Sequence, residues 1–231
     1  MTEPSLLQRA VAEAVGTALL LATVIGSAIM GEQLADGNMA LVLLANSLAT
    51  GAILVVLILI FGSISGAHFN PAVSLTFLFR GELERRAIFP YLTAQVIGAI
   101  VGVMIAHLMF DRAATVVSTI PRLGPGQWLG EIVATFGLVA TILGCQRARP
   151  EATAYAVGLF ITAAYWFTSS TSFANPAVTI ARTLTDSVAG IRAIDMPLFV
   201  VMQLIGAALA GLLFAWLAIG KRARDPALEK N

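Results

Sequence analysis

Charged residues are scarce in this chain: Asp, Glu, Lys and Arg together make up 12% of its 231 residues, against 58% hydrophobic residues. With a mean hydropathy of +0.87, this balance excludes a soluble globular domain and indicates an integral membrane protein. Cysteine is almost absent, and the single Cys145 excludes an intrachain disulfide. The net charge of +1 provides no basic patch, so we do not expect nucleic acid as a partner.

Long apolar runs, in contrast, fill most of the chain. Six are long enough to cross a bilayer, at roughly 10–30, 40–62, 88–110, 128–146, 152–170 and 196–220. The first contains Glu13 and lacks a small-residue cleavage site, so we expect an uncleaved span and not a signal peptide. An even number of spans places both termini on one side. Ten of the 14 Lys and Arg residues fall on that side, which predicts a multi-pass protein of the cell (inner) membrane with cytoplasmic termini.

The triplet Asn-Pro-Ala occurs twice, at residues 70–72 and 175–177, each time after a long apolar run and a short loop. Asn is a preferred N-cap and Pro is preferred at the first helical position. Each triplet therefore predicts a helix start, and the first helical residues are Pro71, Ala72, Pro176 and Ala177. About ten helix-compatible residues follow each start, or about 15 Å, half of a ~30 Å hydrocarbon core. Two half-helices that enter from opposite faces meet near the midplane, which is a pore architecture.

The chain also contains an internal repeat. Residues 12–17 match residues 130–135, residues 95–99 match residues 203–207, and the two Asn-Pro-Ala triplets lie 105 residues apart. Three spans per repeat is an odd number, so the second repeat is inverted relative to the first. Inverted repeats with broken helices are typical of proteins with a solute site at the membrane midplane.

Residues 66–74 (Gly-Ala-His-Phe-Asn-Pro-Ala-Val-Ser) and 172–178 (Ser-Phe-Ala-Asn-Pro-Ala-Val) resemble the two signature loops of the aquaporin, or major intrinsic protein, family. The resemblance covers nearly the whole chain. It implies an all-α membrane protein with six transmembrane helices plus two re-entrant half-helices. We expect one transmembrane channel domain over residues 1–231, with repeat one at about 8–112 and repeat two at about 126–222. The resemblance further implies passive conduction, no catalytic activity, no metal or other cofactor, and a homotetramer with one pore per protomer.

In such a channel Asn70 and Asn175 lie at the pore centre, with amides that are fixed by capping and donate into the lumen. The N-termini of the half-helices carry roughly +0.5 elementary charge each and repel cations. Irregular backbone at this depth is tolerated only where it lines a cavity. The carbonyl groups expected to line the pore are those of Gly66, Ala67, His68, Ser172, Phe173 and Ala174.

The expected selectivity filter departs from the family pattern. Val178 directly follows the second Asn-Pro-Ala, where most aquaporins have Arg. Counted from the two Asn residues, the other filter positions fall on Thr50, Ala163 and Ser172. None of the four has a ring or a charge, so we expect a wide, weakly selective filter. A few bacterial aquaglyceroporins encoded beside arsenic-resistance genes resemble this pattern, which implies glycerol-like polyols and neutral metalloid acids, such as arsenite or methylated arsenicals, as solutes. A water-selective aquaporin is the alternative.

Arg182 is a candidate to supply the missing positive charge in the outer vestibule. It lies four residues beyond Val178, on the same face if the half-helix continues. In the alternative interpretation its side chain reaches the lipid headgroups or pairs with Asp186. Tyr165 and Trp166 are close enough in sequence to the filter to narrow the outer mouth.

Glu13 and Glu131 are carboxylates inside spans, at equivalent positions of the two repeats. Such groups cost roughly 2.5–3.5 kcal/mol to insert, so each needs an explanation. The family resemblance implies that they brace the re-entrant loops by accepting backbone N–H groups. The alternative is a proton-coupled secondary transporter that uses both glutamates. A structural membrane protein with an occluded pore is a further alternative, which the unremarkable outer loop at about 111–127 does not favour.

Overall fold

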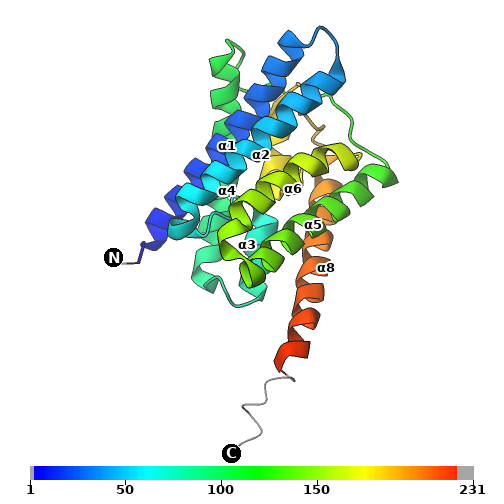
Figure 1. Ribbon diagram of the computed structural model, residues 1–231. Helices are drawn as coiled ribbons and strands as arrows, with labels where there is room; N and C mark the ends of the chain where they lie inside the picture. Colours follow the sequence, from blue (N-terminus) through cyan, green and yellow to red (C-terminus); the bar gives the residue numbers. More distant parts are fainter. Residues whose placement is uncertain (1–2, 223–231) are drawn as a thin grey trace, which may run out of the picture.

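The computed structural model describes residues 3–222, so Arg224 and Lys230, two of the ten cations counted above, lie outside the described residues. The described chain forms eight α-helices and two short 3₁₀ turns (Figure 1). In chain order these are α1 (Leu6–Leu34), α2 (Met39–Ser65), α3 (Pro71–Phe79), α4 (Arg85–Met109), α5 (Pro125–Ala148), η1 (Pro150–Ala152), α6 (Thr153–Phe167), α7 (Pro176–Ala181), η2 (Arg182–Leu184) and α8 (Met196–Arg222).

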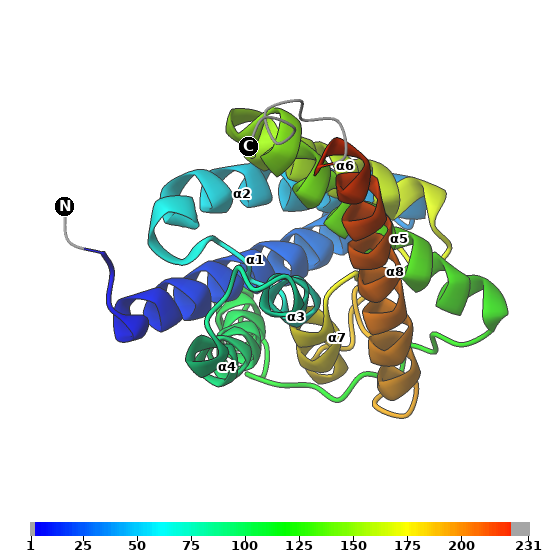
Figure 2. The same cartoon turned by 90° about the horizontal axis from the view of Figure 1, so that it is seen from below.

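The six longer helices pack side by side in the order α4, α1, α2, α6, α5 and α8. The two short helices α3 and α7 lie between α4 and α8, at the ends of this series (Figure 2). The contacts follow the repeat, because α1 packs on α2 and α4 as α5 packs on α6 and α8. Six long helices and two half-helices are therefore present, as the sequence predicts.

The distribution of polar and apolar residues is that of a protein in a bilayer. Large apolar side chains are exposed on the outer faces of the helices, among them Leu7, Phe89, Leu159, Leu212 and Trp216. Polar side chains are buried inside instead, and the fully buried ones include Glu13, Gln95, Glu131 and Gln203. Because lipid offers no hydrogen bonds, polar groups at this depth need partners within the protein.

The helix α6 is shorter than the span expected at 152–170. It has 15 residues, or about 22 Å. Among the described residues, the other five long helices are long and apolar enough to cross a membrane by length and composition. The helix α6 ends at Phe167 because Thr168 adopts an extended conformation, with φ −106° and ψ 136°, and directs the chain into the second re-entrant loop.

Both half-helices start where the sequence predicts, but they differ in length. The side-chain oxygen of Asn70 accepts from the N–H of Ala72 at 2.9 Å, and that of Asn175 accepts from the N–H of Ala177 at 2.9 Å. A proline occupies the first turn of each helix. The helix α3 has nine residues, whereas α7 has six and then tightens into the 3₁₀ turn η2. The expectation of about ten helical residues is thus met more closely by α3.

Glycines permit the close approach of the helices that join each repeat. Gly98 on α4 lies against the backbone carbonyl of Ala14 on α1, and Gly206 on α8 lies against that of Ile132 on α5. A Cβ atom at either glycine would overlap the carbonyl oxygen. Small residues at such contacts are typical of membrane helix packing.

We therefore expect Gly98→Ala to destabilise the fold by about 1–3 kcal/mol, as overpacking does. The measurement is the thermal unfolding midpoint of the detergent-solubilised protein. Gly62→Ala on α2 is the matched control, because nothing lies within 4 Å of a Cβ atom there. Equal midpoints for the two variants would contradict the proposed close contact.

Candidate functional site

Asn70 and Asn175 connect the two re-entrant loops at the centre of the molecule. The amide nitrogen of Asn70 donates to the carbonyl of Ala174 at 2.7 Å, and that of Asn175 donates to the carbonyl of Phe69 at 2.8 Å. Their side-chain oxygens cap α3 and α7, so both amides have a fixed orientation. An NH₂ group has two donors, which leaves each asparagine one N–H beyond the bond to the opposite loop.

The loop backbone is strained in the same way in both repeats. Ala67 and Ser172, which are 105 residues apart, have φ of 50°, and Phe69 and Ala174, at the same offset, have φ of 48°. Such left-handed conformations cost about 1–3 kcal/mol each in residues other than glycine. Residues held in this way cluster at functional sites, where the surrounding structure maintains them.

The buried carboxylate of Glu13 holds the first re-entrant loop. It accepts the backbone N–H groups of His68 at 2.9 Å and Phe69 at 2.6 Å. The hydroxyl of Ser65 donates to it at 2.6 Å and the side-chain amide of Gln95 at 2.8 Å. Four donors from the protein thus surround this carboxylate.

Glu131 does the same in the second repeat. It accepts the N–H groups of Phe173 at 3.0 Å and Ala174 at 2.9 Å, and the amide of Gln203 at 2.6 Å. Gln203 is the counterpart of the Gln that contacts the first carboxylate. Both glutamates therefore have the contacts expected of loop braces, and these contacts occupy the oxygens that a proton-coupling pair would need.

A cavity of about 90 Å³ runs along the two loops. About 10–15 Å³ suffices for one water-sized molecule, so this cavity has room for several. Its wall includes both asparagines, the loop residues whose carbonyl groups are expected to line the pore, and three of the four expected filter residues. These are Asn70, Asn175, Gly66, Ala67, His68, Phe173, Ala174, Thr50, Ser172 and Val178.

Ala163, the fourth expected filter residue, does not line this cavity. Its side chain is exposed on the outer face of α6, whereas Ile161 and Tyr165 lie one turn apart on the inner face and both contribute to the wall. The hydroxyl of Tyr165 lies 3.2 Å from that of Thr50. The expectations for Ala163 and for a filter without a ring are therefore wrong, because a count back from Asn175 ignores the helical register of α6.

Trp166 does not narrow the mouth. It is 48% exposed and donates to the hydroxyl of Ser47 at 3.0 Å.

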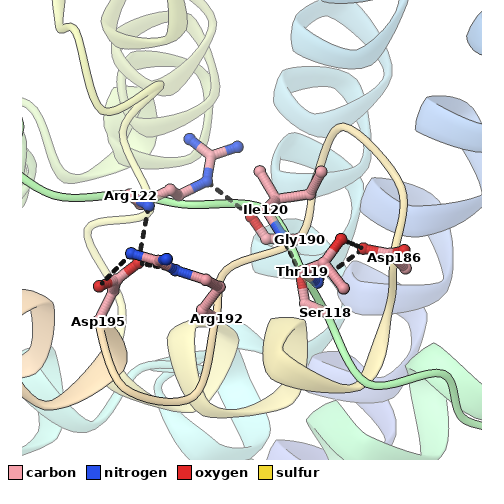
Figure 3. A network of polar contacts seen from close by, with 8 residues as sticks. All are labelled: Ser118, Thr119, Ile120, Arg122, Asp186, Gly190, Arg192 and Asp195. Carbon is pink, nitrogen blue, oxygen red and sulfur yellow. Dashed lines mark hydrogen bonds and ion pairs between the residues drawn. The ribbon is translucent and has the colours of Figure 1, made fainter.

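Arg182 is part of the cavity wall and is only 2% exposed. Its Nε donates to the carbonyl of Ala189, and its guanidinium carbon lies 3.3 Å from the ring centre of Phe173. Asp186, its alternative partner, accepts instead from the backbone N–H and the hydroxyl of Thr119, at 2.7 and 2.9 Å (Figure 3). Arg182 therefore lies in the cavity wall and does not pair with Asp186, because η2 continues the face of α7 on which Val178 lies.

Arg122, in the loop between α4 and α5, is a buried arginine that no motif in the sequence indicates. Its guanidinium donates to the carbonyls of Gly190 at 2.7 Å, Val188 at 2.7 Å and Ser170 at 3.1 Å. Burial lowers its pKa to about 10, so it remains protonated at neutral pH. The one feature of the sequence that singles it out is that no other charged residue occurs between residues 113 and 130.

The loop that carries Arg122 is held against the segment between η2 and α8 by several hydrogen bonds (Figure 3). The backbone N–H of Arg122 donates to Asp195 at 2.9 Å, and Arg192 pairs with the same carboxylate at 2.9 Å. The backbone N–H of Arg192 donates to the carbonyl of Ile120, also at 2.9 Å. Partial burial raises the pKa of Asp195, but the bonds from Arg192 and Arg122 outweigh it and hold this pKa below its ordinary value.

Comparison with known proteins agrees with this geometry. The sequence matches the model of the Major intrinsic protein family over residues 1–153 and 145–228. The chain belongs to this family. The expected family and all-α fold are confirmed, and the protein is a multi-pass membrane channel and not an enzyme.

Similar proteins include both aquaglyceroporins and aquaporins. The chain is 57% identical to aquaglyceroporin AqpS of Rhizobium meliloti (strain 1021), over 94% of this chain and 93% of that protein. It is 32% identical to the probable aquaporin AqpM of Archaeoglobus fulgidus, over 93% of this chain and 98% of that protein. The X-ray structure of the aquaglyceroporin from Plasmodium falciparum has the same fold, with a TM-score of 0.70 at 20% identity, covering 91% of this chain and 94% of that one.

We expect Glu131→Gln to destabilise the second re-entrant loop, because an amide offers one acceptor oxygen in place of two. At least one buried N–H then lacks a partner, which costs about 1–3 kcal/mol. The thermal unfolding midpoint in detergent measures this loss. Glu151→Gln, at an exposed position in η1, is the control and should leave the midpoint unchanged. A Glu131→Gln protein as stable as the unaltered chain would show that the carboxylate is not the brace.

Proposed function

We propose that the protein is a passive channel for small uncharged solutes: glycerol-like polyols and neutral metalloid acids such as arsenite or methylated arsenicals, together with water. The observation that carries this proposal is Val178, a small apolar residue in the cavity wall beside Thr50 and Ser172. An arginine there would occupy much of this space. The similarity to AqpS, which is named an aquaglyceroporin, supports the same class of solute. A water-selective aquaporin is the second candidate, because Tyr165 brings a ring into the wall.

The centre of the pore selects against cations. The N-termini of α3 and α7 meet there, each with a partial positive charge, and the amides of Asn70 and Asn175 add fixed donors. A neutral solute loses water here but meets donors from the asparagines and acceptors from the loop carbonyls. A cation loses its water as well, and it meets the positive ends of both half-helices, which oppose its passage.

Membership of this family also supports a proposal for the arrangement of the chain in the membrane. We propose one channel domain over residues 1–231, a homotetramer with one pore per protomer, and cytoplasmic termini in the cell (inner) membrane. The excess of Lys and Arg on the side of the termini supports this orientation, and the apolar outer faces of the helices suit contact with lipid and with neighbouring protomers.

Passive flux distinguishes this proposal from the proton-coupled alternative. In proteoliposomes a channel lets the solute concentrations inside and outside become equal, and it does not accumulate solute against a gradient. Accumulation of glycerol against its gradient, abolished by an uncoupler, would instead support a transporter that uses Glu13 and Glu131.

The side chain at position 178 should decide which solutes pass. We expect Val178→Arg to reduce glycerol and arsenite permeation about tenfold or more, and water permeation much less, because a guanidinium fills the space that larger solutes need. Stopped-flow light scattering on one proteoliposome preparation measures all three permeabilities.

Val178→Leu is the control for volume without charge, and it should have a weaker effect on the larger solutes. Equal proportional losses for every solute would show that position 178 is not the discriminating wall.

A further inference from the structure

The position of Arg182 in the pore wall is supported by the repeat. The residue 105 positions earlier is Phe77, which also lines the cavity, on the other half-helix. The ring of Phe77 stacks on His68 with 4.7 Å between ring centres, and the guanidinium of Arg182 stacks on Phe173, the counterpart of that histidine, at 3.3 Å. The same wall position in the two repeats thus holds a ring in one half of the pore and a cation in the other.

The guanidinium of Arg182 is held in place but keeps donors to spare. Its Nε bonds the carbonyl of Ala189, and its plane is fixed by Phe173. Arg122, whose guanidinium carbon is 4.7 Å from the same ring centre, ties down the surrounding loops. Within residues 3–222, no hydrogen bond is formed by the terminal nitrogens of Arg182. A buried guanidinium with unused donors at a cavity wall requires acceptors from the cavity contents.

Ser172 has an unused group in the same wall. Its side-chain oxygen is buried and has no hydrogen-bond partner among the described residues. The residue lies in the second loop, next to Phe173, on which Arg182 stacks. A buried hydroxyl without a protein partner is uncommon in native proteins and points to a hydrogen bond with water or a ligand.

The rest of the wall is of mixed character. Thr50 and Tyr165 contribute hydroxyls that are 3.2 Å apart, whereas Val178 and Val24 are apolar. A solute with several hydroxyls on a small apolar frame matches this combination. A cation does not match it, because it would meet a fixed positive charge.

We propose that Arg182 and Ser172 form a hydrogen-bonding subsite for the hydroxyls of neutral solutes in the half of the pore formed by the second repeat. Arg182 in η2 thus supplies the positive charge of the filter, which in most aquaporins comes from an arginine at the position of Val178. This inference rests on the proposed channel function. The subsite replaces the water that a polyol loses, so it lowers the barrier for polyols more than the barrier for water.

The test compares glycerol and water permeabilities by stopped-flow light scattering on proteoliposomes, with the glycerol flux of protein-free liposomes subtracted. Ser172→Ala should lower the glycerol-to-water ratio about threefold and Arg182→Gln about tenfold, the effects of one neutral and one charged hydrogen bond. Ser172→Ala should leave the thermal midpoint unchanged or raise it, since the hydroxyl it removes has no partner. This variant therefore keeps the test valid if Arg182→Gln fails to fold.

Arg112→Gln is the matched control, because this arginine lies in the loop that follows α4 and does not line the cavity. The glycerol-to-water permeability ratio of this variant should equal that of the unaltered chain. If Ser172→Ala leaves the ratio unchanged while the unaltered chain conducts glycerol, the subsite is wrong and the channel function stands. If the unaltered chain conducts neither solute above protein-free liposomes, the proposed function and the subsite both fail.

Discussion

The whole pore depends on two buried carboxylates that satisfy backbone N–H groups at membrane depth. The re-entrant loops before α3 and α7 have no helical partners for these groups, and lipid offers none. Glu13 and Glu131 each accept two adjacent N–H groups, and each is itself held by a glutamine from α4 or α8. Without these acceptors the loops would carry several unpaired groups, each of which costs a few kcal/mol when buried. The glutamates thus explain why irregular backbone persists where a helix would otherwise be required.

Because the glutamates accept these N–H groups, the loops can adopt a conformation that they would not adopt alone. The left-handed residues of the two loops recur at an offset of 105, and each asparagine donates to the carbonyl of the opposite loop. The strain of one loop is therefore maintained by contacts with the other. The contact between the two loops is a property of both repeats together, and neither half would form it by itself.

Features that depend on local or repeated sequence could be predicted, and features that depend on tertiary contacts could not. The starts of α3 and α7 follow from Asn and Pro alone, and the bracing role of the two glutamates follows from the family resemblance. A count back from Asn175 gives Ala163, whereas the register of α6 places Tyr165 in the wall. Arg122 contacts carbonyls 48 to 68 residues away in the chain, and no spacing in the sequence encodes such contacts.

An inverted repeat alone would make a pore with two equivalent ends, so selectivity at one end requires that the symmetry be broken there. The structure breaks it in three connected places. The helix α7 tightens into η2, where the counterpart α3 remains regular. A cation occupies position 182, where the counterpart is Phe77. The loop that carries Arg122 packs on the second half, where its guanidinium lies near the ring of Phe173. All three differences between the repeats lie near the ring of Phe173. The stack of Arg182 on Phe173 is therefore where the two ends of the pore differ chemically.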